Sequence, residues 1–161
     1  MSVLPPSAVR AIIQNEWPGA QAWAERNGWT VDLDLDELRL RASTEHPAVR
    51  RPVEFVAYLG GYRALPPAWH VVVPGTDRDA GKDDFPQPGG PGPSIFHGNL
   101  VLCAPWNRLA YKSVNPNGPH DDWGGPEGWL SVSGEHTRAH TLGDMLAAID
   151  VFLQSSPGMM A

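Results

Sequence analysis

The residue of this sequence best suited to covalent chemistry is its single cysteine, Cys103. A thiolate is both a strong nucleophile and a good leaving group at neutral pH, and acyl transfer through a covalent intermediate needs both properties. His97 and Asn99 stand shortly before Cys103 in the sequence. The side-chain amide of Asn99 is a candidate hydrogen-bond donor to an oxyanion, whereas His97 is expected to brace the turn rather than act as a base.

Other interpretations of these residues stay open. A lone cysteine is often a small buried hydrophobe, and Asn99 can equally be an ordinary turn residue. In the later loops, His120, His136 and His140 are the histidines that could reach Cys103. His120-Asp121-Asp122 has the residue types of a metal site, but no further ligand stands at useful spacing, so we predict a solvated loop and no metal. No triad pattern is readable, which makes a cysteine hydrolase the weakest enzymatic interpretation.

The first third of the chain has the pattern of helix followed by strand. Residues 7–17 carry apolar side chains at helical spacing. Pro18-Gly19 is expected to interrupt this helix, and a second short helical stretch ends at Asn27-Gly28. Strict alternation of apolar and acidic residues then predicts a half-buried strand over 29–35, and residues 38–42 resume the alternation.

The strands that lead to Cys103 are more apolar. Residues 52–59 and 68–73 are expected to form buried strands, and residues 99–103 a short fourth strand with Cys103 at its end. Short connections without helices separate neighbouring strands at the start of this series. Because such connections join antiparallel neighbours, we predict an antiparallel meander.

The elements after Cys103 are a long loop and a helix. Residues 104–128 are rich in Asn, Pro, Gly and Asp, and are expected to be irregular. Thr141 is a predicted N-cap with Asp144 in the capping-box position, and an apolar stripe follows over 142–153. A second irregular segment, residues 76–93, is rich in Pro, Gly and mixed charge, and is predicted to be mobile.

Length and composition set the protein class. A chain of 161 residues fits one domain, residues 1–161, of α+β class, and its 42% hydrophobic and 19% charged residues are ordinary for a globular fold. The net charge of −6 without a basic stripe argues against nucleic acid and membrane as partners. The N-terminus lacks a signal-peptide pattern, no segment is apolar enough to span a membrane, and one cysteine cannot form an internal disulfide. A cytoplasmic location is therefore expected.

A wider set of landmarks surrounds the cysteine: Tyr62, Pro66-Pro67, His97-Gly98-Asn99, Cys103 and Trp129. In this order, over about residues 5–155, the chain resembles a ubiquitin-conjugating enzyme. That family has an N-terminal helix, an antiparallel meander, a tyrosine-and-proline turn, a His-Pro-Asn motif, the catalytic cysteine, a tryptophan loop and a crossover helix. Here Gly98 stands in place of the proline, Asn99 is unusually near to Cys103, and the loop after Cys103 is longer.

The resemblance implies a UBC-like fold with four antiparallel strands, an active-site loop and a C-terminal crossover helix. It implies a thioester-forming transferase without a cofactor, in which Cys103 carries a ubiquitin-like protein and passes it to an amine. The expected partners are that ubiquitin-like protein and an activating-enzyme-like protein. The expanded loops suit divergent bacterial relatives, some of which are encoded beside antiphage nucleotidyltransferases. A cGAS-like nucleotidyltransferase is therefore a candidate target, and antiphage defence is the expected setting. The alternatives are a catalytically inactive binding module of the same fold and, more weakly, a cysteine hydrolase.

Overall fold

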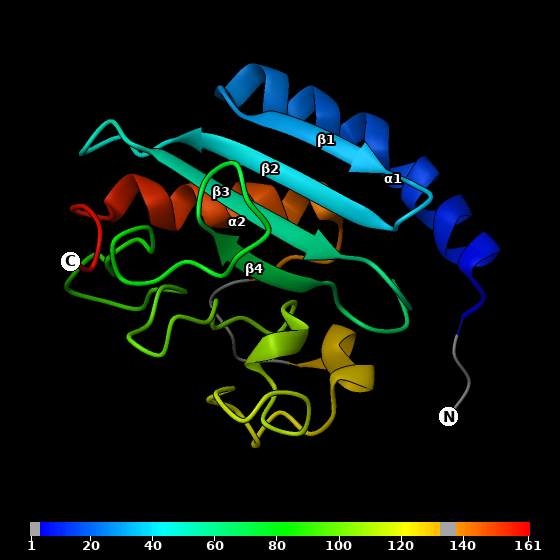
Figure 1. Ribbon diagram of the computed structural model, residues 1–161. Helices are drawn as coiled ribbons and strands as arrows, with labels where there is room; N and C mark the ends of the chain where they lie inside the picture. Colours follow the sequence, from blue (N-terminus) through cyan, green and yellow to red (C-terminus); the bar gives the residue numbers. More distant parts are fainter. Residues whose placement is uncertain (1–3, 133–137) are drawn as a thin grey trace.

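A four-stranded antiparallel sheet lies at the centre of the computed structural model, which describes residues 4–132 and 138–161 (Figure 1). The strands follow one another in chain order as a meander: β1 (Thr30–Asp34), β2 (Arg39–Glu45), β3 (Pro52–Tyr58) and β4 (Ala68–Val72). One helix precedes the sheet and another ends the fold: α1 (Pro6–Asn27) and α2 (Leu142–Ser155). The predicted α+β layout of N-terminal helix, four-stranded antiparallel meander and C-terminal helix is confirmed.

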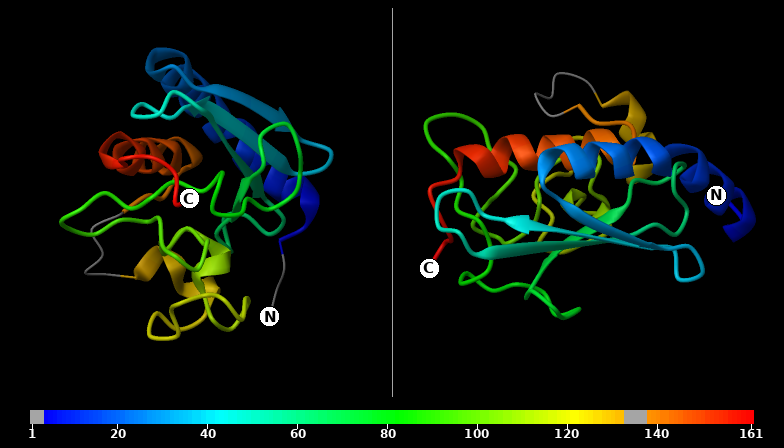
Figure 2. Two further views of the ribbon diagram at one scale, coloured as in Figure 1. Left: turned by 60° about the vertical axis from the view of Figure 1, so that its left-hand side comes forward. Right: turned by 90° about the horizontal axis from the view of Figure 1, so that it is seen from above.

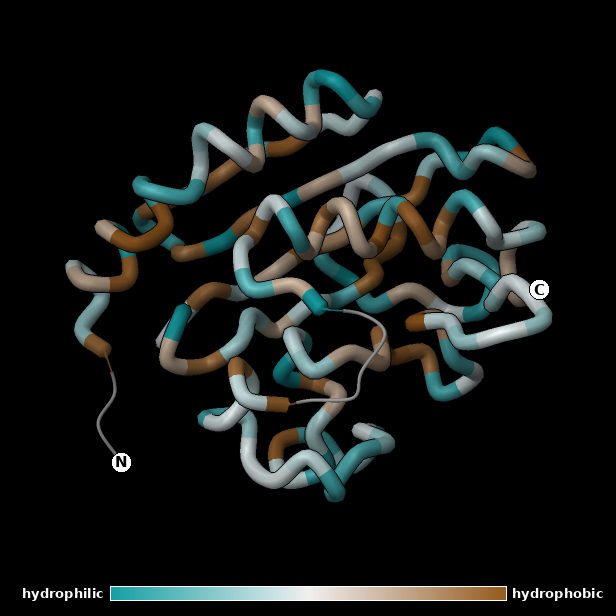
Figure 3. The backbone as a smooth tube through the Cα atoms, turned by 180° about the vertical axis from the view of Figure 1, so that it is seen from behind, coloured by the Kyte–Doolittle hydropathy of each residue, from teal (hydrophilic) through white to brown (hydrophobic). Residues whose placement is uncertain are grey.

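Both helices cover the same face of the sheet and pack against each other (Figure 2). The strand register aligns the buried side chains of this face: Leu40 pairs with Ala57, and Ala57 pairs with Trp69. On α2 the predicted apolar stripe is buried, and the predicted cap is present because Thr141 Oγ1 accepts a hydrogen bond of 3.1 Å from the backbone N–H of Asp144. Figure 3, the view from behind, shows hydrophobic residues recurring along the helices and the strands.

The predicted break in the first helix is wrong, because α1 continues through Pro18. A proline inside a helix removes one backbone donor and costs about 3 kcal/mol. Packing offsets this cost, since Val9 and Ile13 before the proline and Ala20 and Ala24 after it are all buried. Tertiary burial therefore outweighs the local preference of Pro18 to end a helix.

The identity of the four strands differs from the prediction. The alternating stretch that starts at residue 29 is two strands, β1 and β2, because Leu38 adopts a left-handed φ of 52° and the chain reverses there. Conversely, residues 99–103 are not a strand and make only an isolated bridge between Phe96 and Leu102. Leu100, with a φ of 62°, lies in a turn that its N–H closes onto the carbonyl of His97 at 2.9 Å. Both differences come from left-handed backbone at a leucine.

The segment 76–93 has no helix and no strand, but it is packed against the end of the chain. Phe85 is fully buried, and its carbonyl accepts a hydrogen bond of 3.0 Å from Met160 N. The N–H of Gln87 donates to Gly158 O at 2.8 Å. These contacts argue for local order near Phe85, and the mobility expected for 76–93 stays a prediction.

A buried histidine joins the β2–β3 connection to the residues that follow α2. Nδ1 of His46 accepts a hydrogen bond of 3.1 Å from the N–H of Ala48, and Nε2 lies 2.9 Å from Ser156 Oγ. That hydroxyl donates in turn to the carbonyl of Gly158 at 3.0 Å. Burial lowers the pKa of His46 below its usual 6.5, because the charged ring loses its hydration there, and hydrogen bonding to the backbone only partly opposes this shift.

Among the described residues, no helix is long and apolar enough to cross a membrane.

Candidate functional site

Cys103 lies in an irregular segment that the core holds in place. Its backbone N–H donates to the carbonyl of Ile95 at 2.8 Å, and the neighbouring side chains of Leu102 and Ala104 are buried. Cys103 as a residue is only partly buried. A partly exposed cysteine on a fixed backbone meets a condition that a nucleophile needs.

The side chain of Asn107 fixes the backbone on the other side of Cys103. Its Oδ1 accepts hydrogen bonds from the N–H of Trp69 at 2.9 Å and from that of Leu109 at 3.2 Å. Its Nδ2 donates to the carbonyl of Leu102 at 2.9 Å. Asn107 is fully buried, so it joins the edge strand β4, the residue before Cys103 and the short helix η1 (Arg108–Ala110).

A closed turn brings His120 to Cys103. The backbone of His120 pairs with this turn's other end, accepting from Lys112 N at 2.7 Å and donating to Ala110 O at 3.0 Å. The turn is tight at Gly118, where an added Cβ would lie 2.8 Å from the carbonyl carbon and oxygen of Tyr111. Only glycine permits so close an approach between two backbones. The segment after η1 therefore returns to the cysteine at a defined position.

Cys103, His120 and Asp122 form a continuous chain of polar contacts. The Cys103 Sγ lies 2.8 Å from His120 Nε2, and His120 Nδ1 lies 3.1 Å from Asp122 Oδ1. The His120 hydrogen bond holds the pKa of Asp122 below its usual 3.8, so this carboxylate is ionised at neutral pH. A carboxylate at Nδ1 favours the tautomer that carries its proton there, which leaves Nε2 free to accept the thiol proton. The arrangement is that of a nucleophile, a base and a group that orients the base.

The other predicted residues that the structure describes make hydrogen bonds elsewhere in the loops. Nδ2 of Asn99 donates to the carbonyl of Asn117 at 2.9 Å, and the Asn99 side chain is exposed. His97 Nε2 lies 2.8 Å from Ser94 O, a geometry that braces the turn. The backbone of His140 accepts a hydrogen bond from Arg63, and His136 lies outside the described residues.

A cavity of about 310 Å³ lies between the edge of β4 and the residues around Asn99 and Asn117, and neither Cys103 nor His120 is among its lining residues. Asn99 and Val101 line it on the Cys103 side, and Asn117 lines it on the His120 side. Its lining includes the ion pair of Asp79 with His70 and no lysine or arginine, so the cavity offers no strong site for a phosphate group.

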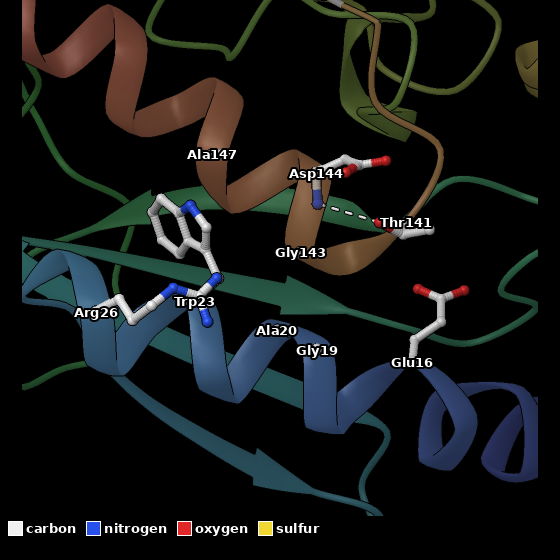
Figure 4. A pocket seen from close by; sticks show the side chains of 9 residues that line it. All are labelled: Glu16, Gly19, Ala20, Trp23, Arg26, Thr141, Gly143, Asp144 and Ala147. Atoms are coloured by element: carbon white, nitrogen blue, oxygen red, sulfur yellow. Dashed lines mark hydrogen bonds between the residues drawn. The ribbon is translucent and has the colours of Figure 1, made fainter.

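A second cavity, of about 340 Å³, lies between α1 and α2 and shares no lining residue with the first (Figure 4). Its half-buried carboxylate, Glu16, accepts from the hydroxyl of Tyr62 at 2.8 Å and from the N–H of Leu142 at 2.8 Å. Burial, together with the charge of Glu16, raises the pKa of Tyr62. The carboxylate thus serves the first turn of α2 and the packing of Tyr62, and we assign it a structural role.

The described residues contain no group of three or more His, Cys, Asp or Glu side chains that could hold a metal ion. The triplet His120-Asp121-Asp122 lies in a loop with two exposed carboxylates, and His120, one of the histidines expected to reach Cys103, contacts its sulfur while Asp122 bonds to the other ring nitrogen. A His-x-Asp pair in the sequence indicates that the imidazole and the carboxylate can meet. This spacing does not identify the cysteine as their partner, nor the turn that brings His120 to it.

Comparison of the chain with protein-family models, with curated proteins and with solved structures found no match. The likeness to ubiquitin-conjugating enzymes therefore rests on the order of the landmarks and on the layout of the fold.

Proposed function

We propose that this protein is a ubiquitin-conjugating-type acyl transferase, in which Cys103 accepts the C-terminus of a ubiquitin-like protein as a thioester and passes it to an amine. The observation that carries the proposal is the contact of 2.8 Å between Cys103 Sγ and His120 Nε2, with Asp122 on the other ring nitrogen. The layout of helix, antiparallel meander, cysteine loop and C-terminal helix supports the conjugating type over other acyl transferases.

The two halves of the reaction use the same pair of residues. In the first half, His120 takes the thiol proton, the Cys103 thiolate attacks the activated carbonyl carbon, and the donor's thiol group leaves with a proton. In the second half, an amine attacks the thioester carbon and gives up a proton to His120, while the Cys103 thiolate is the leaving group. Asp122 orients the imidazole and stabilises its protonated form in both halves.

A cysteine hydrolase is the second candidate, and one observation favours it. The hydrogen bond between His120 and Asp122 is the arrangement that also activates a water molecule for attack on an acyl-cysteine. Transfer and hydrolysis share the first half-reaction and differ only in whether an amine or water discharges the thioester. A single experiment on the discharge step therefore separates the two candidates.

The test uses a ubiquitin-like protein that carries a C-terminal thioester, so that no activating enzyme is needed. It is mixed with the protein, and the Cys103 adduct is followed by mass spectrometry under non-reducing conditions. We expect an adduct that added lysine discharges to an amide much faster than water hydrolyses it. Cys103→Ala should form no adduct. His120→Asn should form the adduct on the order of a hundredfold more slowly than the wild type, because general-base assistance is worth about 10²–10⁴-fold.

Each other outcome favours a different function. Discharge that is equally fast with and without lysine identifies a hydrolase. An unmodified wild-type protein whose Cys103 also fails to react with iodoacetamide identifies the binding module, in which the cysteine is structural.

Replacement of Asn99 by alanine, in the same assay, asks whether this exposed amide assists the discharge step, where loss of an oxyanion donor costs about 10²–10³-fold.

A further inference from the structure

The imidazole of His120 lies flat on the indole of Trp123. The two ring centroids are 3.6 Å apart and the planes differ by 7°, so the rings overlap face to face. Every other aromatic contact of the described residues is tilted or edge-on and has its centroids at least 5.3 Å apart. This close parallel contact is thus specific to the histidine that meets Cys103.

Trp123 is itself supported from the core. The ring of Tyr111 meets the indole at 5.4 Å and an interplanar angle of 63°. Tyr111 is fully buried, and its hydroxyl donates to the carbonyl of Pro105 at 2.8 Å. A series of rings therefore runs from the buried Tyr111 through Trp123 to His120, and His120 in turn contacts the thiol. The stack fixes the plane of the imidazole, on which the direction of Nε2 toward the sulfur depends.

We propose that Trp123 is a positioning residue for the Cys103–His120 pair, holding the imidazole plane and stabilising the imidazolium–thiolate form through its ring face. This inference rests on the proposed function of Cys103 as a nucleophile. It adds a residue that stacks on His120 to the contacts of that imidazole with Cys103 and Asp122. Parallel stacking with a planar cation is favourable because the face of an indole is electron-rich.

Besides Trp123, four residues lie at or next to the imidazole. Cys103 and Asp122 are the titratable side chains at its two nitrogens, and Asp121 is adjacent in sequence and exposed. Lys112 contacts His120 through its backbone N–H. Asp122 stabilises an imidazolium by charge, but its side chain is 72% exposed, so water screens it. Trp123 covers one whole face of the ring, where water is excluded by contact.

The test is the pH profile of Cys103 alkylation by iodoacetamide, which reports the thiolate and needs no substrate. We expect Trp123→Leu to raise the midpoint of this profile by about 0.5–1.5 pH units, which corresponds to the range of a cation–π contact. Trp123→Phe keeps a smaller ring face and should raise the midpoint by less. Trp23→Leu removes an indole that packs on Trp29, outside this site, and is the matched control with no shift.

A double-mutant comparison separates positioning from a general structural effect. In a His120→Asn background, Trp123→Leu should produce no further shift, because the ring on which it acts is gone. An unchanged midpoint in both Trp123→Leu and Trp123→Phe, with a raised midpoint in His120→Asn, overturns the role of Trp123 and leaves the proposed function intact. An unchanged midpoint in His120→Asn itself overturns the proposed function. If Trp123→Leu does not fold, the shift in Trp123→Phe decides between these results.

Discussion

The side chain of Asn107 connects three backbone segments around Cys103, and its replacement by alanine tests how that cysteine is held. The change removes the acceptor of the Trp69 and Leu109 N–H groups and the donor to the Leu102 carbonyl. Asn107 is fully buried, so water does not take its place without a rearrangement of the loop. Three backbone groups are then left without a partner in the interior.

The size of the effect follows from these three groups. Leaving a buried donor or acceptor unsatisfied costs about 1–3 kcal/mol. Local relaxation recovers part of this, so we expect Asn107→Ala to lower the free energy of unfolding by about 3–5 kcal/mol. Domains are commonly stable by only about 5–15 kcal/mol, and the variant should therefore lose a large share of its stability.

Asn99 provides the matched control from the same part of the chain. Its exposed side chain makes one hydrogen bond, to the carbonyl of Asn117, and its replacement by alanine should cost less than about 1 kcal/mol. Urea unfolding, followed by tryptophan fluorescence, measures both variants against the wild type. A cost below about 1 kcal/mol for Asn107→Ala, indistinguishable from Asn99→Ala, would refute the bracing role assigned to Asn107.

Two further substitutions test other parts of the structure. Gly118→Ala should slow Cys103 alkylation severalfold by displacing the turn that carries His120, since an added Cβ would lie 2.8 Å from the backbone of Tyr111; Gly98→Ala, with nothing within 4 Å of an added Cβ, should alkylate at the wild-type rate. Burial lowers the pKa of His46, so below about pH 6.5 the unfolded chain takes up a proton that the folded chain refuses. The free energy of unfolding should therefore fall as the pH drops from 7.5 to 5, and it should fall less in His46→Gln.

The fold was largely predictable because its strongest elements follow local rules. The apolar runs at 52–58 and 68–72 and the cap at Thr141 are set by short-range patterns, and each appears where expected. The two failures in the strand assignment have a common physical origin. An apolar run such as 99–103 is equally compatible with a strand and with an irregular buried segment, and the left-handed backbone at Leu100 has no counterpart in residue type.

The candidate site was predictable in its nucleophile and, as one of three candidate histidines, in His120. Cys103 stands out by chemistry, but its contact with His120 depends on the turn closed by Gly118 and on backbone pairing across residues 110–120. Both are tertiary features of a loop without periodicity. The stack on Trp123 likewise needs the position of Tyr111, which the core sets. Sequence patterns predict which residues of one helix or strand are buried. They do not predict contacts between irregular segments, and the contacts of this site are of that kind.

The solvent exposure of His120 and Asp122 bears on how the proposed thioester would be discharged. The side chain of His120 is 25% exposed and that of Asp122 is 72% exposed, so the site lies at the surface rather than in a closed pocket. A hydrolase that acts on a small ester gains from enclosing it, because a water-excluded site strengthens every electrostatic contact. A transferase between two proteins instead needs its thioester open to an approaching amine. The exposure of His120 and Asp122 therefore favours the proposed discharge of the Cys103 thioester by an amine. In this proposal Asp122 serves chiefly to orient His120.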